Sequence, residues 1–244
     1  MNISGNTILI TGGSSGIGLS LAQKLAALNN KVIITGRDKN KLAEIQQRIP
    51  GLHICAGDLS ENDGIRELVE HIRQEHPDLN ILINNAGVQY NYSFLTVSQL
   101  SEKIDYEIHS NLAAPVKLTS QLLPLLLTRE HAAIVNVSSA LWLAPKKSAA
   151  VYCATKAGIH SYTKALRFQL EGSPVRVFEV IPPLVDTPMT AGRGKAKMSS
   201  DEVALHIISS LSANRYEAYI GKSKLLKLIN RIMPSLAERI MKNG

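Results

Sequence analysis

Short apolar runs alternate with stretches of helical periodicity along most of the chain. Aliphatic and β-branched residues fill runs at residues 7–11, 31–35, 81–83, 133–137 and 175–181. Between the first two runs, Ile17, Leu21, Leu25 and Leu28 form one helical stripe. This alternation is typical of right-handed βαβ units, in which helices bury both faces of a parallel sheet. It predicts an α/β fold with a doubly wound, seven-stranded parallel sheet in a single domain.

Length and composition are consistent with one domain, and the sequence has no pattern typical of an export signal. The 244 residues, 45% of them hydrophobic, suffice for a full core, and no linker, repeat or low-complexity block interrupts them. The chain enters its first apolar run without a signal-peptide pattern, and no run approaches the roughly 18 apolar residues of a membrane span. The two cysteines, Cys55 and Cys153, have no metal-ligand spacing. We therefore expect a cytoplasmic protein without a metal site.

A glycine-rich turn joins the first apolar run to the following helical stretch. Gly12, Gly16 and Gly18 punctuate this turn, which also contains Ser14 and Ser15. Glycines let a backbone approach a pyrophosphate closely, and a helix N-terminus presents free amide donors to it. Strand, glycine turn and helix in this order favour a dinucleotide site over an ordinary turn.

Tyr152 and Lys156 lie four residues apart, which places them on one face of a helix. A positive charge about 4 Å from the phenol, at an effective dielectric constant of about 20, is worth about 4 kcal/mol, or roughly three pKa units in favour of phenolate. Such a tyrosine exchanges protons near neutral pH, where general acid–base catalysis is most effective. Taken alone, the pair is also compatible with two ordinary solvated side chains.

Two further polar residues support a catalytic interpretation. Ser139 follows the apolar run at residues 133–137, so it lies at the sheet edge where ligands bind, although a serine pair also caps strands. Asn111 lies within a helical pattern from Ile104 to Leu126, where asparagine is unfavourable because its side chain competes for backbone hydrogen bonds. It either holds a local helix irregularity or faces solvent.

In this order the motifs resemble those of the short-chain dehydrogenase/reductase family, from about residue 5 to about residue 190. The segment from Thr11 to Gly18 resembles the family's Thr-Gly-x-x-x-Gly-x-Gly turn, and the segment from Asn84 to Gly87 resembles the one after its fourth strand. The family's catalytic tetrad is matched by Asn111, Ser139, Tyr152 and Lys156. Residues 151–156 and 182–187 are similar to those of the bacterial DltE-like oxidoreductases.

The resemblance implies a Rossmann-like fold and an NAD(P)-dependent oxidoreductase, commonly a homodimer or homotetramer. In it, Asp58 and Leu59 correspond to the adenine-contacting pair, and Thr187 to the threonine that contacts the nicotinamide amide. Pro183 replaces a glycine of many relatives, which should stiffen the adjacent backbone. The cofactor-binding residues are then Gly12, Ser14, Ser15, Gly16, Ile17, Gly18, Arg37, Asp58, Leu59, Asn85, Ala86, Gly87, Tyr152, Lys156 and Thr187.

The end of the second apolar run bears on the choice of cofactor. Gly36 stands where an NAD-preferring site usually has an acidic residue for the ribose hydroxyls. Arg37 offers a planar donor fork for a 2′-phosphate, and Ser14 could add a hydroxyl. The sequence therefore favours NADP(H) over NAD(H). In the alternative, Arg37 is solvated and Asp38 binds the ribose.

The matched residues predict hydride transfer between the nicotinamide and a ketone or aldehyde, or the reverse oxidation of an alcohol. The family's mechanism implies that Ser139 binds the carbonyl oxygen and Tyr152 donates the proton. Lys156 lowers the tyrosine pKa and holds the nicotinamide ribose, while Asn111 maintains a water relay. A non-catalytic NAD(P)-sensing regulator is the alternative, and the presence of all four residues weighs against it. A sugar-nucleotide epimerase or dehydratase would need a longer chain.

The expected substrate pocket favours a small, hydrophobic carbonyl compound, because most of its residues are apolar or aromatic. Its border is predicted at Gln89, Tyr90, Tyr92, Leu141, Trp142 and Leu143, although Trp142 fits a core position equally well. Residues 190–200 are rich in small and basic residues, which indicates either a lid over the pocket or a solvated loop.

The last stretch of the chain is strongly basic. We expect residues 1–221 to form the catalytic domain and residues 222–244 a helical extension, which carries six basic residues and one acidic residue and so holds +5 of the formal net charge of +7. Its apolar residues recur at helical spacing, with Pro234 dividing two short helices. Packing on the domain or on a partner subunit is favoured over contact with an anionic membrane surface. Nucleic acid is not an expected partner, because no DNA-binding motif accompanies the charge.

Overall fold

The computed structural model describes residues 1–96 and 99–243, which are built around a parallel sheet of seven strands. In spatial order these are β3 (Leu52–Ala56), β2 (Lys31–Gly36), β1 (Thr7–Thr11), β4 (Ile81–Asn84), β5 (Ala132–Val137), β6 (Val175–Ile181) and β9 (Glu217–Tyr219). The chain winds outward from β1 to β3 and then returns to place β4 beside β1. This reversal confirms the predicted doubly wound fold and creates a topological switch point between β1 and β4.

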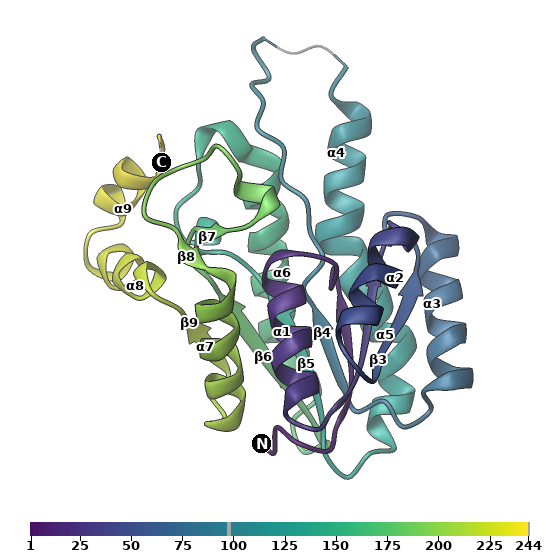
Figure 1. Ribbon diagram of the computed structural model, residues 1–244. Coiled ribbons are helices and arrows are strands. Elements are labelled where there is room, and N and C mark those ends of the chain that lie inside the picture. Colours follow the sequence, from purple (N-terminus) through teal and green to yellow (C-terminus); the bar gives the residue numbers. More distant parts are fainter. Residues whose placement is uncertain (97–98, 244) are drawn as a thin grey trace.

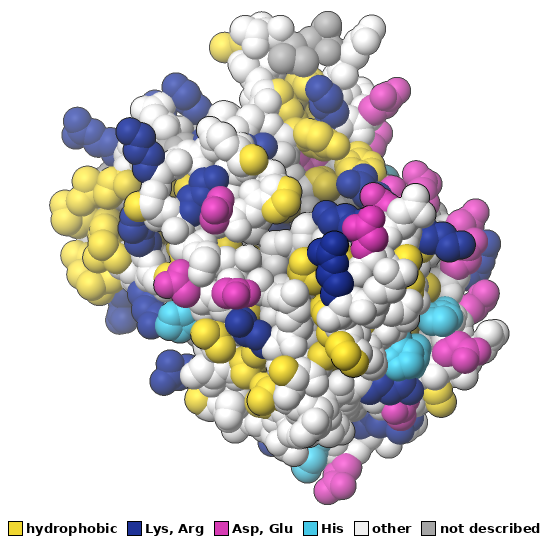
Figure 2. All heavy atoms as spheres, in the orientation of Figure 1, with side chains coloured by type: hydrophobic (Ala, Val, Ile, Leu, Met, Phe, Trp, Pro, Cys, Tyr) yellow, Lys and Arg dark blue, Asp and Glu magenta, His cyan; other side chains and the backbone are white. Residues whose placement is uncertain are grey.

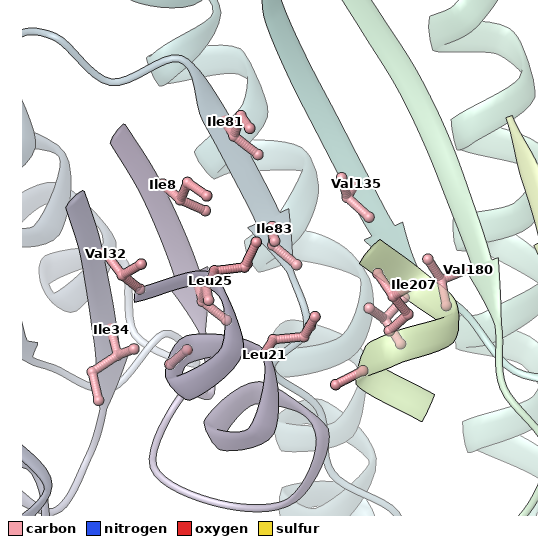
Figure 3. Close-up of a cluster of buried hydrophobic side chains, with 14 of the residues drawn as sticks. Ile8, Leu21, Leu25, Val32, Ile34, Ile81, Ile83, Val135, Val180 and Ile207 are labelled. Carbon is pink, nitrogen blue, oxygen red and sulfur yellow. The ribbon is translucent and has the colours of Figure 1, made fainter. Parts of the chain in front are cut away.

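Helices cover both faces of the sheet (Figure 1). One face carries α1 (Gly16–Ala27), α2 (Lys39–Arg48) and α7 (Ser200–Ser212), and the other carries α3 (Asn62–Glu75), α5 (Ala114–Leu127) and α6 (Ala150–Gln169). Successive side chains of a strand point to opposite faces, so Ile8 packs in one core cluster and Leu9 in the other. Figure 3 shows Leu21 of α1 and Ile207 of α7 within the first cluster. Burial on both faces explains why the strands are continuous apolar runs.

The remaining elements surround the carboxyl ends of the strands. Helix α4 (Ser101–Ile108) continues through a π-helical turn (His109–Ala113) into α5. Short 3₁₀ turns occur at Ala140–Trp142, Lys147–Ala149 and Pro188–Thr190, and β7 (Val185–Asp186) pairs with β8 (Met198–Ser199) in a small second sheet.

Two helices, α8 (Lys222–Ile232) and α9 (Pro234–Met241), end the chain. Pro234 is the first residue of α9, a position where the missing amide hydrogen costs no helical bond. Leu226 and Ala237 anchor the pair in a small cluster with Ala140, Ala144 and Ile181. Within the described ranges, no helix is both long and apolar enough to cross a bilayer.

Candidate active site

A cavity of about 790 Å³ opens at the carboxyl ends of the strands, around the switch point between β1 and β4. Fifteen of the predicted site residues line it: Gly12, Ser14, Ser15, Gly16, Ile17, Arg37, Asp58, Leu59, Asn85, Ala86, Gly87, Ser139, Tyr152, Lys156 and Thr187. The other two, Gly18 and Asn111, lie behind its wall. Residues from the whole length of the chain therefore converge on one cavity.

The glycine turn packs so closely against its neighbours that it leaves no room for side chains at Gly12 and Gly18. Gly12 adopts φ of +65°, and a Cβ there would lie 2.8 Å from the Cα of Ala86. A Cβ at Gly18 would lie 2.3 Å from the Gly12 carbonyl oxygen, so Gly18 serves the close packing of α1 against the turn. Because no side-chain bond caps α1 at Ser15, its first amide donors remain available. This arrangement fits a dinucleotide pyrophosphate.

Asn85 locks the segment after β4 onto this turn. Its amide Nδ2 donates to the carbonyl oxygens of Thr11 at 2.9 Å and Gly12 at 3.2 Å. The Thr11 hydroxyl in turn accepts from the backbone amides of Asn85 and Ala86, at 3.0 and 2.9 Å. The two walls of the switch point are thus joined by hydrogen bonds.

Ser139, Tyr152 and Lys156 meet at one end of the cavity. Ser139 follows β5 and Tyr152 lies on α6, and the Ser139 side chain is near enough to act on the Tyr152 phenol. Lys156 lies one helical turn beyond Tyr152, and its ammonium donates to the Val137 carbonyl at 2.9 Å. The ammonium nitrogen lies 5.7 Å from the centre of the Tyr152 ring. The predicted juxtaposition of phenol, hydroxyl and ammonium is therefore present.

The pKa values at this end of the cavity differ from the sequence prediction. Burial raises the pKa of Tyr152 to about 12, although the nearby Ser139 side chain opposes the shift. Burial also lowers the pKa of Lys156 to about 8, against the attraction of the Glu179 carboxylate. The prediction that Lys156 lowers the phenol pKa toward neutrality is wrong for the protein alone, because desolvation dominates at both groups.

Asn111 lies in the π-helical turn between α4 and α5, and only 1% of the residue's surface is exposed. Its Oδ1 accepts from the Val88 amide at 2.8 Å, while its Nδ2 donates to the Val88 carbonyl at 2.8 Å and to the Thr155 hydroxyl at 3.3 Å. The asparagine therefore marks a helix irregularity, and the solvent-facing alternative is wrong. Through these bonds Asn111 connects a cavity wall to α6.

Replacement of Asn111 by alanine should therefore loosen this wall. Two paired backbone groups of Val88 would lose their partners in a partly buried place, and each group left unsatisfied on burial costs up to about 1–3 kcal/mol. We expect Asn111→Ala to lower the free energy of unfolding by about 2 kcal/mol, measured by denaturant titration. Asn91→Ala is the control, because Asn91 is exposed; an equal effect of the two substitutions would contradict the bridging role.

Comparison with known proteins agrees with this geometry. The sequence profile of the family described as short chain dehydrogenase matches residues 6–198. The chain belongs to the short-chain dehydrogenase family. It is 39% identical, over 89% of its own length and 88% of the relative's, to an uncharacterized oxidoreductase, DltE, of Bacillus subtilis. As a member of this family, the protein is an oxidoreductase that uses a pyridine nucleotide.

Solved structures of the short-chain dehydrogenase family superpose closely on this one. A 3-ketoacyl-(acyl-carrier-protein) reductase from Brucella melitensis, complexed with NADH, is 25% identical with a TM-score of 0.82 and covers 91% of this chain and 100% of its own. A 3-oxoacyl (acyl-carrier-protein) reductase from Agrobacterium tumefaciens, with NADP bound, is 27% identical with a TM-score of 0.77 and covers 85% and 87%. Relatives with this fold therefore bind either nucleotide.

At the opposite end of the dehydrogenase cavity, Arg37 follows β2. Its guanidinium donates to the Tyr106 hydroxyl and lies 5.6 Å above the centre of the Tyr106 ring. Ser14 lies close by, since a Cβ at Gly36 would meet its hydroxyl at 3.1 Å. Asp38 instead caps α2, where its carboxylate accepts from the Lys41 amide at 3.0 Å.

The predicted border of the substrate pocket is only partly right. Gln89 and Leu141 line the cavity, but Tyr90, Tyr92, Trp142 and Leu143 do not. Trp142 stacks on His160 with 3.5 Å between ring centres, and Leu143 packs against the cluster beneath α8 and α9. Their places depend on contacts between distant elements, so proximity in sequence to Ser139 did not reveal them.

Sequence patterns gave no signal for Glu107, because a charged residue in a helical stretch is usually solvated. This carboxylate is fully buried, and it accepts from the Tyr90 amide at 3.1 Å and the Tyr92 hydroxyl at 3.4 Å. Burial raises its pKa. Glu107 thereby holds the segment after β4 against α4.

Arg193 lies in the basic segment expected to form a lid or a loop. It stands between Gly192 and Gly194, which have φ of +72° and +60°. Its guanidinium donates to the Gln89 carbonyl at 3.1 Å, and the residue lines the cavity together with Lys146. The segment therefore covers the substrate end, and it adds positive charge there.

Proposed function

We propose that the protein reduces a ketone or aldehyde with NADPH and that Tyr152 donates the proton. The observation that carries the proposal is that Ser139, Tyr152 and Lys156 line the same cavity, with the Lys156 ammonium nitrogen 5.7 Å from the centre of the Tyr152 ring. A substrate carbonyl oxygen placed beside both hydroxyls would be polarised by two donors, which is the arrangement that general acid catalysis requires.

The protonation state of Tyr152 suits this direction. A pKa of about 12 keeps the phenol protonated at neutral pH, so the proton is available for donation. When bound, the reduced nicotinamide supplies the hydride. As the carbonyl oxygen gains negative charge it becomes a stronger base than phenolate, so proton transfer from Tyr152 is favourable. Ser139 orients that oxygen, and Lys156 can hold the nicotinamide ribose.

The preference for NADP(H) rests on the end of β2. Gly36 provides no acidic group for the ribose, and Arg37 and Ser14 line the cavity beside it. Asp38, the alternative ribose ligand, is engaged in capping α2 and does not line the cavity. The Tyr106 hydroxyl accepts from Arg37 and orients its guanidinium, which supports a role in binding the 2′-phosphate.

Arg37→Ala should therefore separate the two nucleotides. A charge-assisted hydrogen bond is worth about 1.5–3 kcal/mol, so the Kd for NADPH should rise by about 10- to 100-fold while that for NADH stays nearly constant. Titration of both nucleotides by fluorescence measures this change, with Arg48→Ala at the exposed end of α2 as the control. Tighter binding of NADH than NADPH by the unaltered protein would refute the preference.

The substrate end combines apolar and basic side chains. Leu141, Leu184 and Met241 line it together with Lys146 and Arg193. We propose a carbonyl compound with an apolar body. Absorbance of NADPH over a panel of aliphatic and aromatic ketones, with and without an acidic group, tests the reaction and defines the substrate class. Binding of NADPH without consumption by any compound would instead favour a nucleotide sensor.

A further inference from the structure

Helix α8 carries two apolar rows, of which only one is used in packing. Leu226 is buried against the domain, with Ser223 and the half-buried Ile229 beside it. A second row follows the spacing i, i+3 and i+7 on the outer side of the helix, formed by Leu225, Leu228 and Ile232. These side chains are 59%, 54% and 68% exposed. Helical packing on the domain, which the sequence favoured, therefore accounts for only half of this amphipathic pattern.

Basic side chains form a parallel row. Lys224, Lys227 and Arg231 repeat the same spacing and are all exposed. At 3.6 residues per turn, this row lies about a quarter of a turn from the outer apolar row. Lys227 contacts Glu217 and the Tyr219 ring, whereas Lys224 and Arg231 extend from the helix as exposed charges.

Helix α9 extends the same surface. Met233, between the two helices, and Ile240 of α9 are 53% and 49% exposed, and the exposed Arg239 and Lys242 lie beside Ile240 in sequence. Figure 2 shows hydrophobic side chains gathered at the left edge of the molecule, where α8 and α9 lie in Figure 1, with Lys and Arg side chains around them. We call this the α8–α9 surface; its members are Leu225, Leu228, Ile232, Met233 and Ile240 with Lys224, Lys227, Arg231, Arg239 and Lys242.

We propose that the α8–α9 surface docks on an anionic lipid bilayer. An amphipathic helix at a bilayer surface buries an apolar row at the acyl boundary while neighbouring Lys and Arg side chains contact anionic headgroups. Helix α8 is already folded and carries both rows side by side. Shallow docking of this kind requires no membrane-spanning helix.

Charge argues against a second copy of the chain as the occupant. A two-fold dimer brings identical patches together, so a region of net charge +5 would face another of +5. Like charges facing each other across an interface are destabilising. An anionic bilayer supplies the complementary charge as well as an apolar phase. The expected homodimer or homotetramer remains a prediction, and it would have to use another surface.

Docking would place the cavity beside the lipid. Lys222 at the start of α8 and Met241 at the end of α9 both line the cavity. If the proposed carbonyl reduction is correct, an apolar substrate could enter from the bilayer. The docking itself does not depend on the reaction, because the α8–α9 surface contains none of the catalytic residues.

Vesicle co-sedimentation tests the proposal. We expect the unaltered protein to bind vesicles of phosphatidylglycerol and phosphatidylcholine at least tenfold more strongly than vesicles of phosphatidylcholine alone, and to dissociate at high salt. The triple substitution Leu225→Ser, Leu228→Ser and Ile232→Ser should weaken binding at least tenfold. The pair Lys224→Gln and Arg231→Gln should weaken it severalfold.

Two controls make the result specific. Phe168→Ser with Leu205→Ser removes apolar side chains that are 64% and 58% exposed elsewhere, and Arg48→Gln with Lys164→Gln removes exposed charges elsewhere. Neither control should change vesicle binding. Nucleotide titration and the unfolding midpoint should be the same for all variants, which establishes that each is folded.

Three results would overturn the proposal. The first is absence of binding to either vesicle, which would leave an acidic protein as a possible occupant. The second is equal binding to neutral and anionic vesicles. The third is loss of a dimer or tetramer in the triple-serine variant, measured by light scattering, without vesicle binding by the unaltered protein; a second copy would then cover the surface. Because nucleotide binding is measured separately, failure of docking is distinguishable from failure of the proposed reaction.

Discussion

Tyr152→Phe is expected to lower kcat for carbonyl reduction by about 10³-fold. A positioned general acid contributes about 10²–10⁴-fold, and phenylalanine removes the acidic proton while preserving the aromatic ring. Tyr152 is buried, with 8% of its surface exposed, so a phenylalanine ring in the same position should preserve the packing around the cavity. The Kd for NADPH should consequently change by less than about threefold. Steady-state kinetics and fluorescence titration of the same preparations measure both quantities.

Tyr162 provides the matched control for this experiment. It lies on the same helix, is half-buried, and has a pKa that burial also raises. Tyr162→Phe removes a phenol hydroxyl remote from the cavity and should leave kcat unchanged. If Tyr152→Phe kept the rate of the unaltered enzyme, or if both substitutions lowered it equally, Tyr152 would not be the proton donor.

Lys156→Met is expected to inactivate the enzyme and stabilise the fold at the same time. Loss of the ammonium beside Tyr152 should lower kcat/KM by at least about 10²-fold, because it removes the charge proposed to hold the nicotinamide ribose and support the phenol. Burial lowers the pKa of Lys156 to about 8, against an ordinary value of 10.5. The buried charge therefore destabilises the folded state at neutral pH.

The contribution of Lys156 to the free energy of unfolding depends on pH. Below about pH 8 the lysine is charged in both states, and the folded state bears the full desolvation cost, on the order of 3 kcal/mol. Between about pH 8 and 10.5 the unfolded chain binds more protons, so the stability of the unaltered protein rises with pH and the cost fades. Loss of the bond to Val137 offsets about 1 kcal/mol. Lys156→Met should thus gain about 2 kcal/mol at pH 7 and little near pH 10.5.

Denaturant titrations of both proteins at several pH values measure this difference. Lys164→Met serves as the control, because Lys164 lies on the same helix and is exposed. A gain that did not shrink with rising pH would indicate better apolar packing and not relief of a buried charge. Loss of stability at pH 7 would contradict the lowered pKa.

Features encoded in local sequence were predictable. Strand and helix periodicities depend on neighbours one to four residues apart, and they gave the sheet and its flanking helices. The glycine turn was recognisable because Gly12 needs a positive φ and Gly18 a close backbone contact, and few other residues allow either. Asn111 stood out because it breaks a helical pattern, and the structure places a π turn there.

Features that depend on distant contacts were not predictable in the same way. The pKa of Tyr152 is set mainly by burial, which the spacing to Lys156 does not reveal. Trp142 is adjacent in sequence to the catalytic end of β5, yet its ring stacks on His160 of α6. Glu107 becomes a buried acceptor only because the segment after β4 folds over α4. In each case the decisive partner lies far away along the chain.

The most direct test of the account is a crystal structure of the protein with NADP⁺ and a ketone that the NADPH assay identifies as a substrate. The account predicts that the ketone oxygen lies about 2.6–3.2 Å from the hydroxyls of both Tyr152 and Ser139, with the nicotinamide ring beside the carbonyl carbon. A nicotinamide bound elsewhere, or a ketone oxygen out of reach of Tyr152, would contradict it.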